Sequence, residues 1–231
     1  MTLTNKKASD WSKATLGYKF NDEAYLIQAL THRSAATRNN ERLEFLGDAV
    51  LDSVISEIVY RQLPEGAEGE LSRLRSSLVK DSSLAALSAD LDVGTHLILG
   101  PGEKKAGGHR RASILADALE ALFGAVYLDS GYAASMKVIE HVFGNRLTDL
   151  PDPAELRDPK TRLQESLQAE SLPLPDYEVK EISGKAHKQS FVVYCTIPTL
   201  QLQTSGSGAS RRDAEQRAAD SMIRMMSGSS A

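Results

Sequence analysis

The sequence predicts an all-α domain followed by a small α+β domain, and three observations support this prediction. Before residue 150, apolar residues recur at three- and four-residue spacing, which is typical of helices that bury one face. The stretch LTDLPDPAELRDPK then interleaves three prolines with acidic residues, a composition typical of a linker. After it the pattern changes to a helix, three alternating strands and a helix. We therefore expect a helical domain at 1–150, a linker at 151–157, an α-β-β-β-α domain at 158–226 and a flexible tail at 227–231.

The helices of the first domain follow from the apolar spacing. We expect them at 22–31, 41–62, 68–80, 81–91, 112–130 and 132–148. The glycine-rich stretch LGPGEKKAGGHRR, residues 99–111, predicts a loop between two of them. Its basic residues either face solvent or contact an anion, and the sequence alone leaves both open.

The second domain is expected to begin and end with a helix. KTRLQESLQAE predicts the first of these helices and SRRDAEQRAADSMIRMM the last, whereas YEVKEIS, SFVVYCTI and LQLQTS alternate as strands. The hairpin tip GKAHKQ between the first two strands bears Lys185, His187 and Lys188. Alternation in the second strand places Cys195 on the same face as Val193, so we expect a buried thiol there.

Composition indicates an ordinary globular protein. The chain has 231 residues, 41% of them hydrophobic, which is enough to bury a substantial core. One cysteine cannot form an internal disulfide, no apolar run approaches the roughly 18 residues of a membrane helix, and the first residues lack the apolar core of a signal peptide. We therefore expect a cytoplasmic protein without membrane contact. The net charge of −4 is uneven, because residues 157–226 carry 10 Lys and Arg against 9 Asp and Glu, which leaves −5 for the remainder.

Residues 41–50, ERLEFLGDAV, place acidic side chains in an otherwise apolar helix. On a helical wheel, Leu43 and Val50 face opposite to a sector that contains Glu41, Glu44, Asp48 and Asp52. Farther along the helix this acidic sector becomes apolar, so the carboxylates are expected at the mouth of a buried region. Taken alone, such a face is most often a solvated stripe.

A second acidic pair, Asp117 and Glu120, lies in SILADALEALFGAVYL, a helix with little other polar surface. Ala121 and Gly124 share that side and would let another helix approach closely. If the two acidic faces meet, their four carboxylates repel one another and raise their own pKa values unless a cation is present. Oxygen ligands without Cys or His favour Mg²⁺ or Mn²⁺ over zinc. The two motifs together therefore predict a metal site.

The start of the last helix combines an N-cap with two arginines. In GSGASRRDAEQ, Ser210 is the expected N-cap and Asp213 occupies the capping-box position. Arg211 and Arg212 then oppose the helix dipole, which is unfavourable unless an anion binds there. We expect a phosphate at this helix start, with two solvated arginines as the alternative.

Both halves of the chain carry motifs of known families. ERLEFLGDAVL is very similar to the signature of ribonuclease III, and ADALEALFGAVYLD, preceded by LGPGEKKAGG, resembles the second acidic motif of that family in order and spacing. Residues 158–226, from DPKTRLQESLQ through GSGASRRDAEQRAA, resemble a double-stranded-RNA-binding domain. The resemblance covers essentially the whole chain. It implies an all-α endonuclease domain joined to an RNA-binding domain in the usual bacterial order.

The resemblance also implies roles for the acids. Asp48 and Glu120 would be the catalytically critical pair, and Glu41 and Glu68 would be accessory acids in the cleft. Glu68 is chosen over Glu70 because EGELSRLR resembles the family pattern EG-x-[LM]-S. The metal ligands would be Glu44, Asp48, Asp117 and Glu120.

The implied RNA contacts lie in the second domain. On its hairpin, His187 would reach the minor groove, and Ser210, Arg211 and Arg212 match the phosphate clamp. Arg212 stands where many members have lysine, which preserves the charge and alters the contact geometry. Such domains read the shape of A-form RNA over roughly 16 base pairs. The matching contacts of the first helix are Thr161, Gln164, Glu165 and Gln168.

The implied reaction is Mg²⁺-dependent hydrolysis of a phosphodiester bond. Metal ions lower the pKa of a water for in-line attack and stabilise the departing 3′ oxygen, leaving 5′-phosphate and 3′-hydroxyl ends. The family works as a homodimer that leaves two-nucleotide 3′ overhangs, and Phe45 matches the aromatic residue inserted into the partner. Precursors of ribosomal RNA and other structured transcripts are the implied substrates. Two alternatives stay open: a protein that binds duplex RNA without cutting it, and a hydrolase of small phosphoesters.

Overall fold

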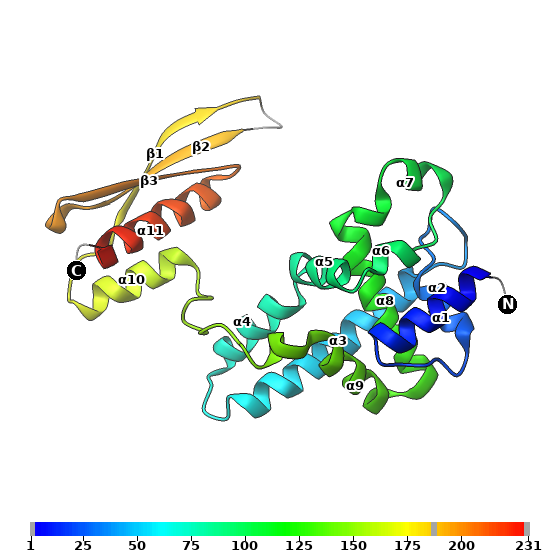
Figure 1. Cartoon of the computed structure of the whole chain (residues 1–231). Coiled ribbons are helices and arrows are strands. Elements are labelled where there is room, and N and C mark those ends of the chain that lie inside the picture. The colour runs from blue at the N-terminus through cyan, green and yellow to red at the C-terminus, as the bar shows by residue number, and fades with distance from the viewer. Residues whose placement is uncertain (1–2, 186–188, 229–231) are drawn as a thin grey trace. The chain divides into compact units, whose positions relative to one another are not determined.

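The computed structural model describes residues 3–185 and 189–228, and the chain divides after Pro151 into two compact units (Figure 1). The first unit is all-α and the second contains one three-stranded sheet with two helices, which confirms the predicted fold class. Residues 151–157, which join the units, contain no helix or strand. Within the described ranges, no helix is both long and apolar enough to cross a membrane.

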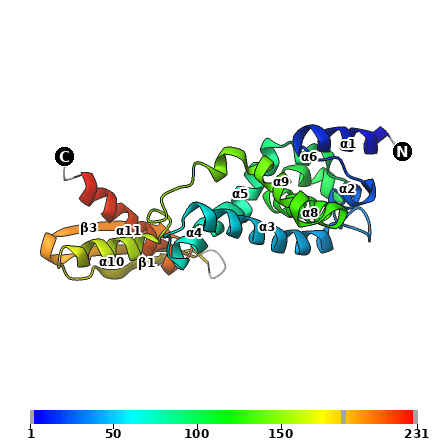
Figure 2. The same cartoon turned by 90° about the horizontal axis from the view of Figure 1, so that it is seen from below.

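The first unit is built around two long helices that pack on each other. Helix α8 is apolar on nearly every side, and most of its residues from Ile114 to Val126 are buried. Helix α3 lies beside it in both views (Figures 1 and 2) and contributes Leu43, Val50 and Val54 to the same core. The α-helices are α1 (Leu3–Thr15), α2 (Glu23–Ala29), α3 (Glu41–Gln62), α4 (Glu68–Val79), α5 (Asp81–Asp90), α6 (Val93–His96), α7 (Pro101–Lys105), α8 (Ala112–Ser130) and α9 (Tyr132–Phe143).

Four local expectations for this unit need correction. The polar helix α1 was not predicted, and neither was the single turn α6. The stretch 99–111 is not wholly a loop, since Pro101 begins the short helix α7 and Gly108–Arg110 form a 3-10 turn. The helix expected to reach residue 148 ends at Phe143, because Gly144 adopts a positive φ of 48° and a 3-10 turn follows.

The second unit packs two helices against one face of an antiparallel sheet. Its elements are α10 (Pro159–Ala169), β1 (Asp176–Ser183), β2 (Ser190–Ile197), β3 (Leu202–Gly208) and α11 (Arg211–Gly228). The strand order is β1-β2-β3, with a register shift between Val179 and Glu181 in β1. Cys195 is fully buried in the core between Leu163 and Met222, which confirms the expected buried thiol. Strand β3 starts two residues later than predicted because Pro198–Leu200 form a 3-10 turn and Gln201 has a positive φ of 56°.

Candidate metal centre and nucleic-acid interface

Two glycines allow the helices α3 and α8 to cross closely. A Cβ atom on Gly47 would lie 1.8 Å from the backbone oxygen of Glu120, and one on Gly124 would lie 2.2 Å from the oxygen of Leu43. No side chain larger than hydrogen fits at either point without moving the backbone. The close crossing brings Glu44 on α3 next to Glu120 on α8, so the two acidic faces meet as predicted.

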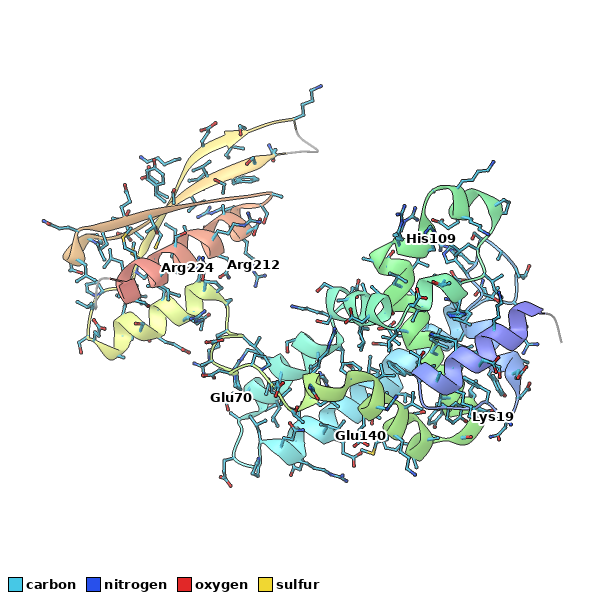
Figure 3. The ribbon with its side chains drawn as sticks, viewed as in Figure 1. Lys19, Glu70, His109, Glu140, Arg212 and Arg224 are labelled. Atoms are coloured by element: carbon cyan, nitrogen blue, oxygen red, sulfur yellow. The ribbon has the colours of Figure 1, made fainter. Side chains whose placement is uncertain are left out.

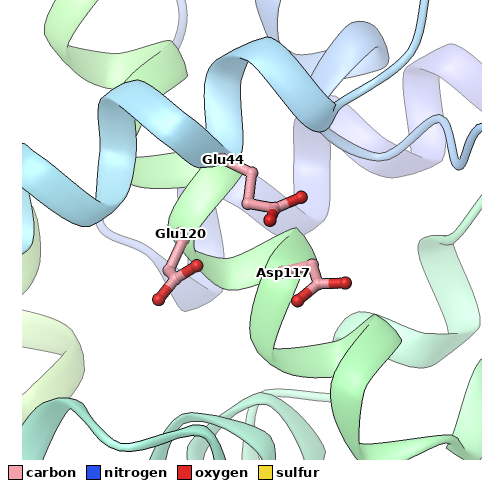
Figure 4. Close-up of side chains that lie close together, drawn as sticks. All are labelled: Glu44, Asp117 and Glu120. Atoms are coloured by element: carbon pink, nitrogen blue, oxygen red, sulfur yellow. The ribbon is translucent and has the colours of Figure 1, made fainter.

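Three carboxylates converge at this crossing. Glu44, Asp117 and Glu120 each offer an oxygen, and these oxygens all lie within 4.8 Å of one another (Figure 4). All three residues are partly buried. Oxygen-only donors at this separation suit a hard divalent cation, so the side chains present fit a metal ion.

The crowding changes the acidity of the cluster. Burial, followed by the negative charges of Asp48 and Glu44, raises the pKa of Glu120 to about 8. Burial and the charge of Asp117 raise the pKa of Glu44 as well, and burial and the charge of Asp81 raise that of Asp117. A bound cation would reverse this trend, because it favours the charged form of every ligand.

Not every predicted acid belongs to this trio. Asp48 lies outside it, yet its charge contributes to the raised pKa of Glu120, and burial together with Asp52 raises its own pKa. Glu41 lines a pocket with Glu44 and Asp117. Glu68 lies elsewhere, in a cavity of about 340 Å³ between α3 and α4, where it accepts a hydrogen bond of 2.7 Å from Ser72 Oγ.

The neighbourhood of the cluster contains residues that sequence reasoning missed. Asp81 at the start of α5 raises the pKa of two cluster acids, although nothing in its sequence context points to the site. His32, Arg33 and Asn40 line the pocket that Glu41 shares with the cluster. The signal that could have suggested them is their place in the segment that precedes the acidic helix, of which Asn40 is the last residue.

Phe45 lies on the outside of the first unit. Its side chain is 81% exposed, although Leu43 two residues earlier on α3 is buried. Around it is a cavity of about 610 Å³ whose lining includes Tyr25, Leu46 and the half-exposed Leu128. An exposed aromatic ring beside an apolar hollow is typical of a protein interface.

In the second unit, the predicted contact residues of α10 share one surface. Gln164, Glu165 and Gln168 are exposed on the face opposite Leu163. Glu165 pairs with Arg157. Thr161 is held at the helix start, because its backbone N–H and its hydroxyl both donate to the Asp158 carboxylate, at 3.0 and 2.9 Å.

The start of α11 forms the expected cap. The backbone N–H of Asp213 donates to Ser210 Oγ at 3.1 Å, and the helix begins at Arg211. Arg211 is tied to Glu215, with 2.8 Å between Nε and Oε1. Arg212 (Figure 3) makes no ion pair with any residue of the described ranges. His187, expected on the hairpin, lies outside the described residues.

Comparison with known proteins gives consistent matches for both units. A family model described as ribonuclease-III-like matches residues 22–147, and one described as double-stranded RNA binding motif matches residues 159–226. The chain is 51% identical over 211 residues to ribonuclease 3 of Pasteurella multocida, covering 91% of this chain and 94% of the relative. It is 53% identical to ribonuclease 3 of Alkalilimnicola ehrlichii, covering 91% and 92%.

A solved structure resembles the first unit. The nuclease domain of ribonuclease III from Campylobacter jejuni, described as having a region involved in dimer formation, aligns with a TM-score of 0.57 and 41% identity. The alignment covers 59% of this chain and 96% of the solved one.

Proposed function

Since this chain belongs to the ribonuclease III family of endoribonucleases, we propose that it cleaves double-stranded RNA with Mg²⁺, leaving 5′-phosphate and 3′-hydroxyl ends. The observation that carries this proposal is the convergence of Glu44, Asp117 and Glu120 within 4.8 Å at the crossing of two helices. Three partly buried carboxylates repel one another, and a divalent cation makes the arrangement favourable.

We assign the metal ligands to Glu44, Asp48, Asp117 and Glu120, with Mn²⁺ as a substitute for Mg²⁺. When bound, the ion would supply Lewis-acid chemistry, activating a water and stabilising the departing oxygen. Asp48 and Glu120 are the proposed catalytic pair, and Glu120 must release its proton, held with a pKa of about 8, to become a ligand. Glu41 and Glu68 are proposed as accessory acids.

The second unit is proposed to hold the duplex. The exposed surface of α10, with Thr161, Gln164, Glu165 and Gln168, is the proposed minor-groove contact, to which His187 adds the hairpin contact. Ser210, Arg211 and Arg212 at the start of α11 are the proposed phosphate contacts. Such contacts select A-form geometry rather than sequence, because the wide minor groove of RNA displays 2′-hydroxyl groups.

We further propose that two copies act together. Phe45 and the apolar hollow beside it support a homodimer in which each ring inserts into the partner. Two clefts, one on each strand, would then produce the two-nucleotide 3′ overhang. Precursors of ribosomal RNA and structured messenger RNA are the proposed substrates, and they lie in the cytoplasm.

One experiment separates this proposal from its alternatives. A labelled RNA duplex is incubated with the full chain in Mg²⁺ and in chelator, and an activated small phosphodiester is tested in parallel. We expect cleavage of the duplex in Mg²⁺ only, with a phosphate on the new 5′ end. Tight binding without cleavage would favour the non-cutting RNA-binding protein, and turnover of the small ester alone would favour a general phosphoesterase.

A further inference from the structure

A pocket of about 340 Å³ opens beside the acidic cluster and shares Glu44 and Asp117 with it. The rest of its wall carries His32 and the cationic side chains of Arg33 and Arg111. It also carries two further acids, Glu41 and Glu103, which pair with these arginines. The pocket therefore combines a proposed metal-binding side with a side on which cations and acids are paired. The metal-binding and catalytic roles proposed above involve only the acidic residues of this region.

Backbone hydrogen bonds fix the segment that carries His32 and Arg33. His32 N–H donates to the oxygen of Ile98 at 3.0 Å, so the segment after α2 runs beside the segment before α7. The N–H of Gly100 donates to Ser34 Oγ at 3.0 Å, and a Cβ on Gly100 would lie 2.2 Å from the Ser34 oxygen, so only glycine fits there. Because this backbone is already fixed, only the ordering of the side chains is left to oppose ligand binding.

Arg33 is the cation best able to accept a new partner. Its side chain is 71% exposed, and its ion pair with Glu41 measures 3.4 Å, longer than a strong charge-assisted hydrogen bond. Arg111 is already paired with Glu103 at 2.9 Å. Arg33 lies close to the cluster, because it lines the same pocket as Glu44 and Asp117.

Asn40 adds a donor without an acceptor. The residue is 2% exposed and lines the same pocket, and its Nδ2 atom is buried without a hydrogen-bond partner among the described residues. A buried donor of this kind is destabilising until an acceptor reaches it. An anionic oxygen in the pocket would be such an acceptor.

We propose that this pocket binds a backbone phosphate of the RNA strand next to the phosphate that is cleaved, with Arg33 as its main cationic contact. This inference rests on the proposed function, since it assumes that the adjoining acids hold the metal that acts on RNA. The planar guanidinium of arginine can donate two parallel hydrogen bonds to phosphate oxygens, which fixes the strand beside the cluster. Arg33 is thus a residue that positions substrate.

The first test compares four proteins in single-turnover cleavage of a synthetic duplex at saturating Mg²⁺: the parent, Arg33→Ala, Arg33→Lys and Arg38→Ala. Arg38 is a matched control, because it is exposed five residues away and donates to Gln28 Oε1 outside this pocket. We expect Arg33→Ala to slow cleavage about 10- to 100-fold, as for loss of a hydrogen bond to a charged group. Arg33→Lys should recover part of the rate, and Arg38→Ala should stay within about twofold of the parent.

The Mg²⁺ dependence separates this role from an indirect effect on the metal. Removing a positive charge beside the carboxylates should tighten Mg²⁺ binding, which alone would favour cleavage at low Mg²⁺. Slower cleavage at saturating Mg²⁺, with an unchanged or lower Mg²⁺ midpoint, supports the phosphate contact. A loss that excess Mg²⁺ restores, or a rate equal to that of Arg38→Ala, overturns it.

The second test removes the charge from the RNA instead. Two duplexes are used, each with one neutral methylphosphonate linkage. In one duplex the linkage lies on the 5′ side of the cleaved bond, and in the other on the 3′ side. We expect one of these to slow the parent about as much as Arg33→Ala does, and to slow Arg33→Ala little further. If each linkage slows Arg33→Ala by the same factor as it slows the parent, Arg33 contacts neither phosphate and the proposal is wrong. Absence of cleavage by the parent on unmodified RNA would instead mean that the proposed function itself is wrong.

Discussion

The two units differ in how far their charged side chains are already satisfied. In the first, Glu44, Asp117 and Glu120 crowd together, and burial with mutual repulsion raises the pKa of Glu120 to about 8. In the second, Glu215 accepts both Lys160 at 2.7 Å and Arg211 at 2.8 Å. The contrast suits the proposed metal site, because a cation would relieve the repulsion in the first unit. In the second unit most of these charges are paired, so Arg211 must exchange an ion pair to contact RNA, whereas Arg212 has none to exchange within the described ranges.

Apolar surface shows the same contrast. Phe45 of the first unit is 81% exposed, more than any other large hydrophobic side chain in the described ranges. The second unit also exposes apolar side chains, but the most exposed of them, Ile182, is 57% exposed and is not aromatic. The first unit thus carries the most exposed ring, beside a hollow that suits a second copy.

The largest effect is expected for Glu120→Gln, which removes one carboxylate from the crowded cluster of the first unit. If the crowded acids exist to hold metal, cleavage in Mg²⁺ should fall by about 100-fold or more, since even changes beyond the direct ligands of a metal commonly cost 10- to 100-fold. Because most duplex contacts are proposed for the other unit and Arg33 is unchanged, affinity for RNA in Ca²⁺ should stay near that of the parent. Single-turnover cleavage and a binding titration measure the two effects.

A matched control is Asp52→Asn, which changes another acid of α3 that lies outside the trio and faces Arg75 at 4.0 Å. It should keep cleavage within about threefold of the parent, as expected for a surface ion pair of little energetic weight. Fast cleavage by Glu120→Gln would remove that residue from the mechanism.

Phe45→Ala tests whether the exposed ring of the first unit is a dimer contact. If the ring is buried in a partner, its loss should weaken the dimer by about 3–5 kcal/mol, the usual cost of truncating a buried aromatic side chain. Sedimentation at low micromolar concentration would then show a monomer. Tyr60→Ala, which truncates another strongly exposed ring of α3, should leave the dimer intact. An undiminished dimer for Phe45→Ala would contradict the interface assigned to this face.

Arg211→Ala combined with Arg212→Ala tests the phosphate contacts proposed for the second unit. Duplex binding should weaken for all sequences, and the slope of log affinity against log salt should flatten by roughly one counterion per lost phosphate contact. Because Arg211 is already paired with Glu215, most of the change should come from Arg212. Arg217→Ala with Arg224→Ala removes the same charge from the same helix and serves as the control. A salt slope equal to that of the control would show that the first two arginines only face solvent.

The sequence predicted the parts of the fold that depend on regular patterns. The apolar spacing located the long helices α3 and α8, and the small residues on α8 correctly indicated a close helix crossing. Helix α1 was not predicted because its sequence LTNKKASDWSKAT is mostly polar. Distant contacts of Trp11 anchor it instead: its Nε1 donates to the Leu91 oxygen at 2.9 Å, and its ring stacks on that of His96. A contact across 80 residues leaves no local pattern.

The candidate site was predictable only where its residues share an element. Glu44 and Glu120 stand on periodic helices, so a helical wheel groups each with its neighbours. Asp81 and Arg33 reach the same region from the start of α5 and from the segment after α2, and both influence the pKa of Asp117. Their positions depend on how separate elements pack, which spacing along the chain does not encode.

The smallest expected effect is the most specific, and it concerns the stability of the metal-free first unit. Burial and the charges of Asp48 and Glu44 raise the pKa of Glu120 from 4.5 to about 8 in the folded chain. Between these pH values the folded state keeps a proton that the unfolded state has released, so stability falls as the pH rises through this window. In chelator, the melting temperature should therefore fall by a few degrees between about pH 5 and pH 8.

Glu120→Gln should abolish this part of the pH dependence, because the amide is neutral at every pH and does not repel its neighbours. At pH 8 the variant should melt at the same temperature as the metal-free parent or higher, whereas Glu140→Gln on the exposed side of α9 (Figure 3) should keep the parental profile. Mg²⁺ should stabilise the parent most at high pH, since binding requires the Glu120 proton to leave. A variant that melts well below the parent at both pH values would show that the carboxyl group is a structural hydrogen-bonding group. Hydrogen bonds would then satisfy the carboxyl groups of the cluster without a metal, as ion pairs satisfy most charges of the second unit.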